Sequence, residues 1–351
     1  MHSVIYGSNR ERTYDEMSIV DQYDQDMTRQ PISIAISTMD RRKDLAKLLD
    51  SLKKLNYPKE SLEIVIVEEG DKPDPINDVK YIFIPRLNKG FSFTRNIAVQ
   101  NCSHKLIAFV DDDCEVTPDW LNELSKHLKD DVSGVIGSVE VKNCNAIGWC
   151  ENILGYPGGG LNAIDEAGNN IRSTESIVTC NALLRSEAIR SVGGFDESNN
   201  LRFGGEDAVL ALYFNREKFK LIYNPSAIVY HKPKENMIDI FKWASRMGKG
   251  HTLLAQYIHG RSISFNIFRK LLTFKIILFI IGLFIFYNHS FYYTLIVLLI
   301  YFIKINSTYI FHRKYIKKWP IFLLLPIVKA AFDLGEDFGR IYAFLYIRES
   351  R

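Results

Sequence analysis

The chain has 351 residues, of which 47% are hydrophobic and 24% are charged, close to the values of ordinary globular proteins. Its formal net charge of only +3 gives no reason to expect a nucleic acid as partner. The five cysteines include no C-x-x-C pair and no zinc-ligand spacing with histidine. This excludes a recognisable cysteine zinc motif, and the odd number argues against a full disulfide framework.

The first part of the chain divides into a short arm and a region of alternating patterns. Residues 1–30 are polar and lack the apolar stretch of a signal peptide, so they are predicted to form a loosely ordered N-terminal arm. Apolar residues then alternate with small polar ones at 32–37, and leucines recur at helical spacing over 43–55. Further strands are expected at 63–67, 79–84 and 106–110, and a helix at 93–101. Strands that alternate with helices predict parallel β-α-β units in an α/β fold.

The pattern continues from residue 119 to residue 231. A helix is predicted to open at Asp119 and Trp120, after a proline. Residues 155–170 are rich in glycine and asparagine, which predicts a mobile loop beside the site. The other expected elements are strands at 134–141, 176–184 and 220–230 and a helix at 206–218.

Polar side chains follow three of the predicted strands. In open parallel sheets, ligands bind beyond the carboxyl ends of the strands. The side chains at those ends would therefore share one crevice, and they are Ser37 and Thr38, Glu68 and Glu69, and Asp111–Asp113.

Three adjacent aspartates follow the apolar strand L-I-A-F-V. A D-x-D pair that leaves a strand can present two carboxylates to one hard divalent cation. Asp111 and Asp113 have this spacing, and Glu115 extends the alternation by one step, whereas Asp112 is expected to point the other way along an extended chain. The alternative is a solvated acidic turn.

A second acidic centre lies at Gly204-Gly205-Glu206-Asp207, just before an apolar helix pattern. Carboxylates favour a helix N-terminus electrostatically, and one of them could instead act as a general base. The two glycines allow a ligand to approach the backbone closely. His231 ends the strand at 220–230 and is either a structural histidine or a ligand of the same cation.

The C-terminal part is predicted to meet a membrane. Residues 271–311 hold two apolar segments joined by a very short turn, a pattern typical of a transmembrane hairpin. Basic residues lie on both flanks and none lies in the turn, which places the flanks and the N-terminal region on the cytoplasmic side of the cell membrane. Residues 312–351 are predicted to be a basic loop followed, at 319–347, by an interfacial or re-entrant helix. The alternative is that the apolar helices are buried in a soluble core.

Residues 236–270 are predicted to form amphipathic helices on the membrane surface. Lys242, Arg246 and Lys249 have the spacing of one helix face. They either bind a pyrophosphate group or form a solvated face.

Six segments within residues 31–235 resemble, in the same order, the motifs of inverting glycosyltransferases of family 2. They are I-S-I-A-I-S-T-M-D-R at 32–41, E-I-V-I-V-E-E-G-D at 63–71, N-K-G-F-S-F-T-R-N-I-A at 88–98, F-V-D-D-D at 109–113, G-G-F-D-E at 193–197 and G-G-E-D at 204–207. The resemblance implies a GT-A fold, a Rossmann-like and mostly parallel sheet flanked by helices, followed by the helical membrane region.

The resemblance also implies roles for the matched residues. The nucleotide-sugar would be bound by Ser37, Thr38, Glu68, Glu69, Arg95, Asn96, Asp111 and Asp112. A Mg²⁺ or Mn²⁺ ion on the donor diphosphate would be held by Asp111, Asp113, Glu115 and His231. Asp207 would be the catalytic base, with Glu206 beside it.

The implied function is a membrane-anchored, metal-dependent hexosyltransferase. It would move one sugar, with inversion, from a nucleotide-sugar to a lipid-linked glycan or a polyprenyl phosphate. The Q-x-x-R-W motif of processive synthases is absent from the basic helix, which favours single transfer. The alternatives are an inactive scaffold with the same fold, and a sugar-phosphate nucleotidyltransferase, whose G-x-G-T-R loop the chain lacks.

Overall fold

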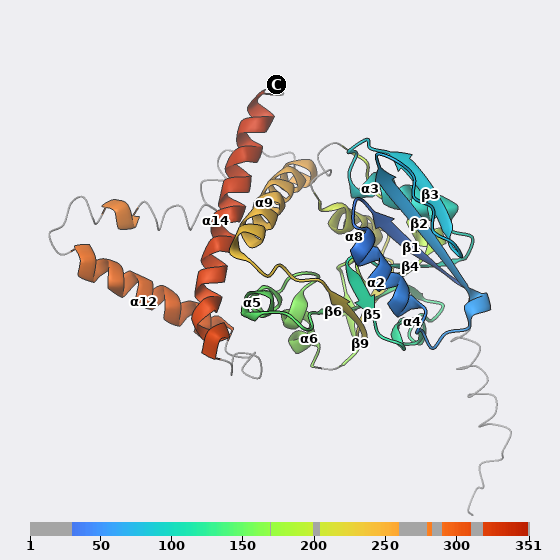
Figure 1. Cartoon of the computed structure of the whole chain (residues 1–351), viewed down its shortest axis with the longest axis horizontal. Coiled ribbons are helices and arrows are strands. Elements are labelled where there is room, and N and C mark those ends of the chain that lie inside the picture. The colour runs from blue at the N-terminus through green and yellow to red at the C-terminus, as the bar shows by residue number, and fades with distance from the viewer. Residues whose placement is uncertain are drawn as a thin grey trace, which may run out of the picture.

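A computed structural model of the chain describes residues 30–168, 170–198, 204–259, 279–282, 290–309 and 319–349. Nearly all of the predicted N-terminal arm and most of the first predicted membrane segment therefore lie outside the described residues. The described part combines a large mixed β-sheet flanked by helices with a set of helices beside it (Figure 1).

The first half of the sheet is parallel, as predicted. β1 (Ile32–Thr38) pairs with β2 (Leu62–Gly70) on one side and with β4 (Leu106–Phe109) on the other. β3 (Lys80–Pro85) pairs with β2 at the edge of the sheet. α2 (Arg42–Leu52) follows β1 as the predicted crossover helix.

The second half of the sheet corrects the expectation of a mostly parallel sheet. β8 (Ala182–Arg185) is antiparallel to both β4 and β6 (Val132–Glu140). β9 (Lys220–His231) is parallel to β6 but antiparallel to β5 (Cys114–Val116) and β7 (Arg172–Thr174). Strand direction here depends on which distant strand is the neighbour, a contact that local periodicity does not encode.

The alternation of side chains along β1 explains how the two faces of the sheet are covered. Ile32, Ile34 and Ile36 are fully buried on one face, while Ala35 contributes to the core on the other. On the isoleucine face, the leucines of α2 pack beside α4 (Trp120–Ser125).

Three further helices contribute buried apolar residues to the core on the other face of the sheet. They are α3 (Phe91–Asn101), α7 (Ser186–Ser191) and α8 (Glu206–Arg216). A short 3-10 turn, η1 (Lys59–Ser61), precedes β2. Because helices cover both faces, the polar edge at the carboxyl ends of β1 and β4 is left to form the site.

Two predicted elements differ from the structure. The expected mobile loop at 155–170 contains α6 (Gly160–Ala167), whose Leu161 is buried against the core. The expected strand at 176–184 is reduced to β8, and α5 (Ala146–Ile153) was not predicted at all. Both helices are short, so their apolar periodicity spans too few residues to be read against the surrounding glycines.

α9 (Met237–His259) and α14 (Trp319–Glu349) pack against each other at very close range. A Cβ on Gly248 would collide with the backbone of α14, and one on Gly339 would collide with the backbone of α9. Glycine is therefore required at both positions for the two helices to approach. The predicted interfacial or re-entrant segment at 319–347 is one helix, which continues through Pro326.

None of the helices in the described part of the chain is long and apolar enough to cross a membrane. The predicted transmembrane hairpin at 271–311 is thus not confirmed. α12 (Ser290–Thr308) covers most of its second segment.

Candidate functional site

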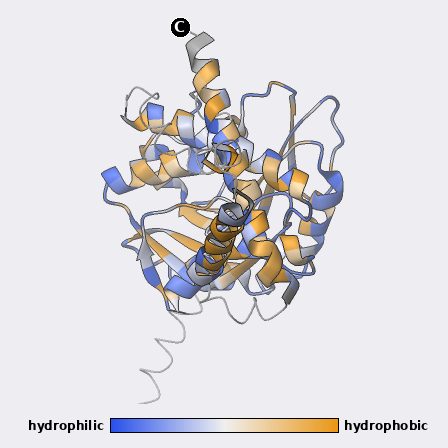
Figure 2. Cartoon of the chain, turned by 90° about the vertical axis from the view of Figure 1, so that its left-hand side faces the viewer, coloured by the Kyte–Doolittle hydropathy of each residue, from blue (hydrophilic) through white to orange (hydrophobic). Residues whose placement is uncertain are grey.

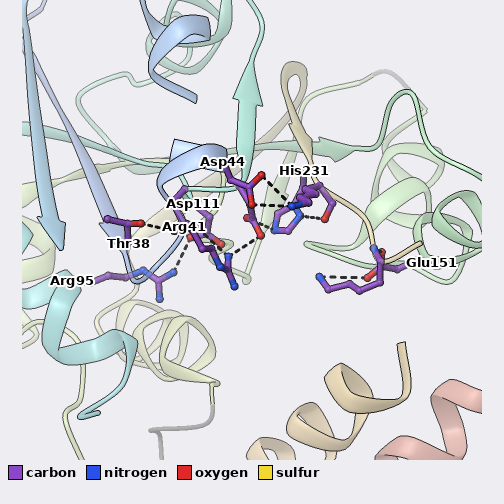
Figure 3. Close-up of polar contacts among 11 residues, drawn as sticks. Thr38, Arg41, Asp44, Arg95, Asp111, Glu151 and His231 are labelled. Carbon is purple, nitrogen blue, oxygen red and sulfur yellow. Dashed lines mark hydrogen bonds and ion pairs between the residues drawn. The ribbon is translucent and has the colours of Figure 1, made fainter. Parts of the chain in front are cut away.

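The candidate site lies where β1 and β4 end, opposite the end of β9. It gathers Thr38 from the end of β1, Arg41 just after it, Asp111 after β4, Arg95 from α3, and His231 from β9 (Figure 3). These residues are far apart in the sequence. Of the residues predicted to share this crevice, Thr38 and the aspartates meet here, whereas Glu68 and Glu69 have other partners.

Asp112 and Asp113 share one guanidinium. Arg41 Nη1 donates hydrogen bonds to Asp112 Oδ1 at 3.0 Å and to Asp113 Oδ2 at 2.8 Å. Thr38 Oγ1 donates to the other oxygen of Asp112 at 2.7 Å. Burial raises the pKa of Asp112 to about 6, against the opposing effect of Arg41 and Thr38.

The expected alternation of the three aspartates is wrong. Asp112 and Asp113 lie in a turn between β4 and β5, not on an extended chain, so Asp112 shares Arg41 with Asp113 instead of pointing away. Asp111 turns to Arg95, whose Nη2 is 3.0 Å from Asp111 Oδ1.

Asp113 and His231 form the part of the site that fits a divalent cation. Asp113 Oδ1 is buried, accepts no hydrogen bond and lies 3.2 Å from His231 Nε2. His231 Nδ1 is 2.9 Å from the carbonyl oxygen of Lys232, which can only accept, so Nδ1 carries a proton. A protonated His231 would thus donate from Nε2 to the carboxylate oxygen, whereas a neutral one would point the lone pair of Nε2 at it. Two such acceptors need a shared proton or a cation, and both are good ligands for a metal ion.

Cys114 completes a geometric cluster with Asp113 and His231, because their ligand atoms lie within 4.8 Å of one another. Burial raises the pKa of the Cys114 thiol well above its ordinary value. A thiol binds metals as the thiolate, so the carboxylate and the imidazole are the better ligand pair. Burial also raises the pKa of Asp113, but His231 and Arg41 outweigh it and keep the pKa of Asp113 below its ordinary value.

Glu115 lies on β5, where its carboxylate accepts from Lys142 Nζ at 2.7 Å. It is not among the residues that cluster around Asp113 and His231. Its predicted place in the metal site stays a prediction.

Arg95 links the two acidic centres. Its guanidinium is buried and pairs with Glu206 through Nη1 and with Asp111 through Nη2. Burial lowers the pKa of Arg95, but these carboxylates raise it further, so the side chain stays charged. The guanidinium of Arg95 therefore joins the two predicted acidic centres.

Asp207 stands at the start of α8, next to Glu206. Gly205 precedes it with φ of 97°, in the left-handed region that favours glycine. Burial, and then the charge of Glu206, raise the pKa of Asp207 to about 7, against the opposing effect of Arg95. A carboxylate of this kind can accept a proton near neutral pH, as a general base must.

The predicted nucleotide-binding residues differ in their contacts. Glu68 accepts from Arg42 Nε at 2.9 Å, and Glu69 accepts from the backbone N–H groups of Leu87 and Asn88 at 2.7 and 2.6 Å. Ser37 Oγ is buried without a hydrogen-bond partner. Glu68 and Glu69 thus shape the neighbouring loops, and a direct contact with a nucleotide remains a prediction for all three residues.

Asn96 holds the turn at G-G-F-D-E. Its side chain exchanges two hydrogen bonds with the backbone of Phe195, both at 2.8 Å, and donates to Glu197 at 2.7 Å. A Cβ on Gly194 would lie 2.8 Å from Asn96 Oδ1, so the turn needs glycine there. Asn96 therefore positions this turn, and its predicted contact with the nucleotide stays a prediction.

The three basic residues of α9 have separate environments. Arg246 is exposed, but the protein around it and the nearby Arg41 lower its pKa, while Glu206, Asp113 and Asp111 act in the opposite direction. Arg246 therefore faces the site. Lys249 Nζ lies 4.0 Å from the centre of the Tyr342 ring of α14, and Lys242 is exposed.

Sequence reasoning missed Arg41 and Glu151. Arg41 lies in a quoted motif and just beyond the carboxyl end of β1, a position that could have identified it. Glu151 on α5 is 1% exposed and accepts from the backbone N–H of Lys234 at 2.7 Å, which fixes the chain that leaves His231 (Figure 3). Since α5 was not predicted, no sequence signal pointed to Glu151.

Comparisons with known proteins identify similar sequences and folds. Residues 33–192 match the family model described as glycosyl transferase family 2. The chain is 29% identical over 256 residues to the succinoglycan biosynthesis protein ExoM of Rhizobium meliloti, covering 67% of this chain and 79% of that protein. It is 26% identical over 228 residues to a pre-mycofactocin glycosyltransferase of Mycobacterium tuberculosis, covering 61% of this chain and 45% of that protein.

Two more similarities extend the comparison. Glycosyltransferase AglE of Haloferax volcanii is 25% identical over 236 residues, covering 62% of this chain and 72% of that protein. The mannosyltransferase PcManGT of Pyrobaculum calidifontis, solved with GDP-Man and Mn²⁺, aligns with 71% of this chain and 74% of its own at 14% identity and a TM-score of 0.47. That likeness is too distant to inform on donor or metal. The similarity to glycosyl transferase family 2 thus covers residues 33–192 of this chain.

Proposed function

We propose that the chain is an inverting, metal-dependent glycosyltransferase that moves one hexose from a nucleotide-sugar to a lipid-linked glycan or polyprenyl phosphate. The observation that carries the proposal is that possible cation ligands and a possible general base lie at the same edge of the sheet. Asp113 and His231 form a pair that could hold a cation, and Asp207 is a carboxylate with a raised pKa. The buried Arg95 connects the two groups, because it pairs with Asp111 near the first and with Glu206 beside Asp207. A relative whose name places it in succinoglycan biosynthesis supports a glycan product.

Each residue of the site would have a separate role in the transfer. Asp113 and His231 would hold Mg²⁺ or Mn²⁺, which neutralises charge on a departing nucleoside diphosphate. Asp207 takes the proton of an acceptor hydroxyl as its oxygen attacks the anomeric carbon. The attack comes from the face opposite the leaving group, so a single displacement inverts the anomeric configuration. Arg95 keeps Asp111 and Glu206 in place around the reacting groups.

Nucleotide binding should depend on a divalent cation. With GDP or UDP present at about 100 times its Kd, Mn²⁺ is expected to raise the unfolding midpoint by about 3–5 °C, because binding to the folded state stabilises it by about 2.7 kcal/mol. In Asp113→Asn, the rise of the unfolding midpoint that depends on Mn²⁺ is expected to disappear. Differential scanning fluorimetry measures both.

The matched control is Asp131→Asn. Asp131 is exposed and pairs with Lys220 at the far end of β9, so this variant should keep the response of the wild type. Failure of every nucleoside diphosphate to stabilise the wild type with Mn²⁺ would favour the inactive scaffold.

The rate should rise with pH through the neutral range. The pKa of Asp207 is raised to about 7 by burial and by Glu206, and a base acts only when it is deprotonated. Below that pKa Asp207 is protonated, so kcat/KM for a hydroxyl acceptor should fall about tenfold for each pH unit below it. A pH profile of kcat/KM tests this, and a flat profile from pH 5 to 8 would contradict the assignment.

We also propose that the enzyme works at the cytoplasmic face of the cell membrane. α12 and α14 lie beside the sheet domain (Figure 1), and the ribbon seen from that side is coloured hydrophobic over much of these helices (Figure 2). Both helices expose large apolar side chains. Those at least 45% exposed include Leu295, Ile296, Leu298, Leu299, Ile300, Ile303, Leu323, Ile327, Phe338, Tyr342 and Leu345. Lipid would remove this surface from water, and four basic residues lie between the two helices in the sequence, at 313–318.

The full chain is expected to float with vesicles that contain anionic lipid. Leu299→Asp with Ile303→Asp should reduce flotation at least about tenfold, because both side chains are 57% exposed on α12 and a charge at each resists insertion. Ser307→Asp, at an exposed polar position of the same helix, is the control and should float normally. If the double variant floats like the wild type, or instead dissociates a dimer in gel filtration, lipid is not what covers this face.

A further inference from the structure

Arg41 binds a carboxylate that a divalent cation in the site would also bind. One nitrogen, Nη1, bridges Asp112 Oδ1 at 3.0 Å and Asp113 Oδ2 at 2.8 Å. Asp113 presents its second oxygen to His231 Nε2 at 3.2 Å. A divalent cation held by Asp113 and His231 would therefore share a carboxylate with a guanidinium, and the two positive groups would repel each other.

The side chain of Arg41 is able to move while its backbone stays fixed. Its carbonyl oxygen accepts from the N–H groups of Asp44 and Leu45 at 3.0 and 2.9 Å, which anchors the start of α2. The side chain is 45% exposed, so a change of rotamer would not unpack the core. Asp112 does not depend on Arg41 alone, because it is buried and also accepts from Thr38.

A second guanidinium faces the same space. Arg246 of α9 is close enough to Arg41, Asp111 and Asp113 for their charges to affect it. Among the described residues it forms no ion pair. Two arginines that face one crevice from different elements suit an anion with several oxygens, such as a diphosphate.

We propose that Arg41 exchanges partners during substrate binding: it leaves Asp113 when the divalent cation arrives and binds the diphosphate of the nucleotide together with Arg246. The exchange couples the two ligands. The cation removes the competing carboxylate from Arg41, and the diphosphate stabilises Arg41 away from the cation. This inference rests on the proposed nucleotide-sugar donor.

Calorimetry on the full chain tests the exchange. The Kd of Mn²⁺ is measured alone and with a saturating nucleoside diphosphate, GDP and UDP in separate series, for the wild type and for Arg41→Gln. Without nucleotide, Arg41→Gln is expected to bind Mn²⁺ about threefold more tightly than the wild type. The variant has no ion pair to break, and an exposed ion pair contributes a free energy of about this size. In the wild type, the Kd of Mn²⁺ without nucleotide should be about tenfold or more higher than the Kd with nucleotide. In Arg41→Gln this ratio should be at least about threefold smaller.

The control is Lys43→Gln, which removes the same charge from an exposed position two residues further on and should behave as the wild type. An unchanged or weaker Kd for Mn²⁺ alone in Arg41→Gln, with an unfolding midpoint like that of the wild type, would overturn the exchange. An unchanged ratio would also overturn it. If the wild type binds Mn²⁺ but neither nucleoside diphosphate, the proposed function itself fails.

Discussion

Replacing Asp207 by asparagine is expected to lower the rate of transfer to a hydroxyl acceptor by about 10²–10⁴-fold, the usual contribution of a positioned base. Asparagine has nearly the same shape as aspartate but cannot take up the proton. Asp207 stands at the start of α8 and not among the residues that cluster around Asp113, so Mn²⁺-dependent nucleotide binding should be retained. A radiolabelled transfer assay and calorimetry on the same preparation measure the two properties.

The control for this variant lies at the opposite end of the same helix. Glu217 is exposed at the C-terminal end of α8, and Glu217→Gln removes the same charge without touching the site. Its activity should equal that of the wild type. Full activity of Asp207→Asn toward a hydroxyl acceptor would eliminate Asp207 as the base. If Asp207→Asn loses little activity with a phosphate acceptor, the acceptor is a phosphate, because a phosphate is already ionised and needs no base.

Replacing Arg95 by methionine is expected to lower the free energy of unfolding by about 3–5 kcal/mol, the cost of breaking a buried ion pair from one side. Both partners of the pair are almost fully enclosed, since the side chains of Arg95 and Glu206 are 8% and 7% exposed. Methionine fills much of the volume but leaves Glu206 buried without its cation. Urea unfolding followed by circular dichroism measures the loss.

A double variant separates charge from packing. Glu206→Gln in the Arg95→Met background removes the uncompensated carboxylate and should recover a substantial part of the lost stability. Arg86→Met is the control, because Arg86 pairs with two exposed aspartates, Asp40 and Asp71, away from Glu206. A loss below about 1 kcal/mol in Arg95→Met, or no recovery in the double variant, would show that the pair does not hold the two acidic centres together.

The sequence predicted the first half of the domain well because its elements are regular. The apolar alternation at 32–37 and the leucine spacing at 43–55 reflect one buried face each, and β1 and α2 follow them closely. The same physics predicted that Thr38 and the aspartates would meet, because parallel strands end at a common edge. Short elements such as α5 and α6 escaped detection, since two helical turns give too little periodicity.

The side-chain contacts of the site could not be predicted from the sequence. Whether Asp112 or Asp111 approaches Asp113 depends on a turn of two residues and on which arginine reaches it. Arg41 directly precedes α2 on one face of the sheet, whereas Arg95 lies on α3 on the other face. No spacing in the sequence relates them to the aspartates. Their side chains therefore determine the geometry that an alternation rule alone predicted wrongly.

The sequence by itself determined the α/β class and the edge of the sheet at which polar side chains gather, and it offered the aspartates and His231 as candidates for a site there. These follow from local periodicity and from the rule that parallel strands end together. Only the tertiary structure decided the antiparallel second half of the sheet and the close packing of α9 on α14. It alone decided that Arg95 joins Asp111 to Glu206, and that Arg41 holds Asp112 and Asp113. Each of these is a contact between segments far apart in the chain, whose energy depends on burial and on the approach of opposite charges.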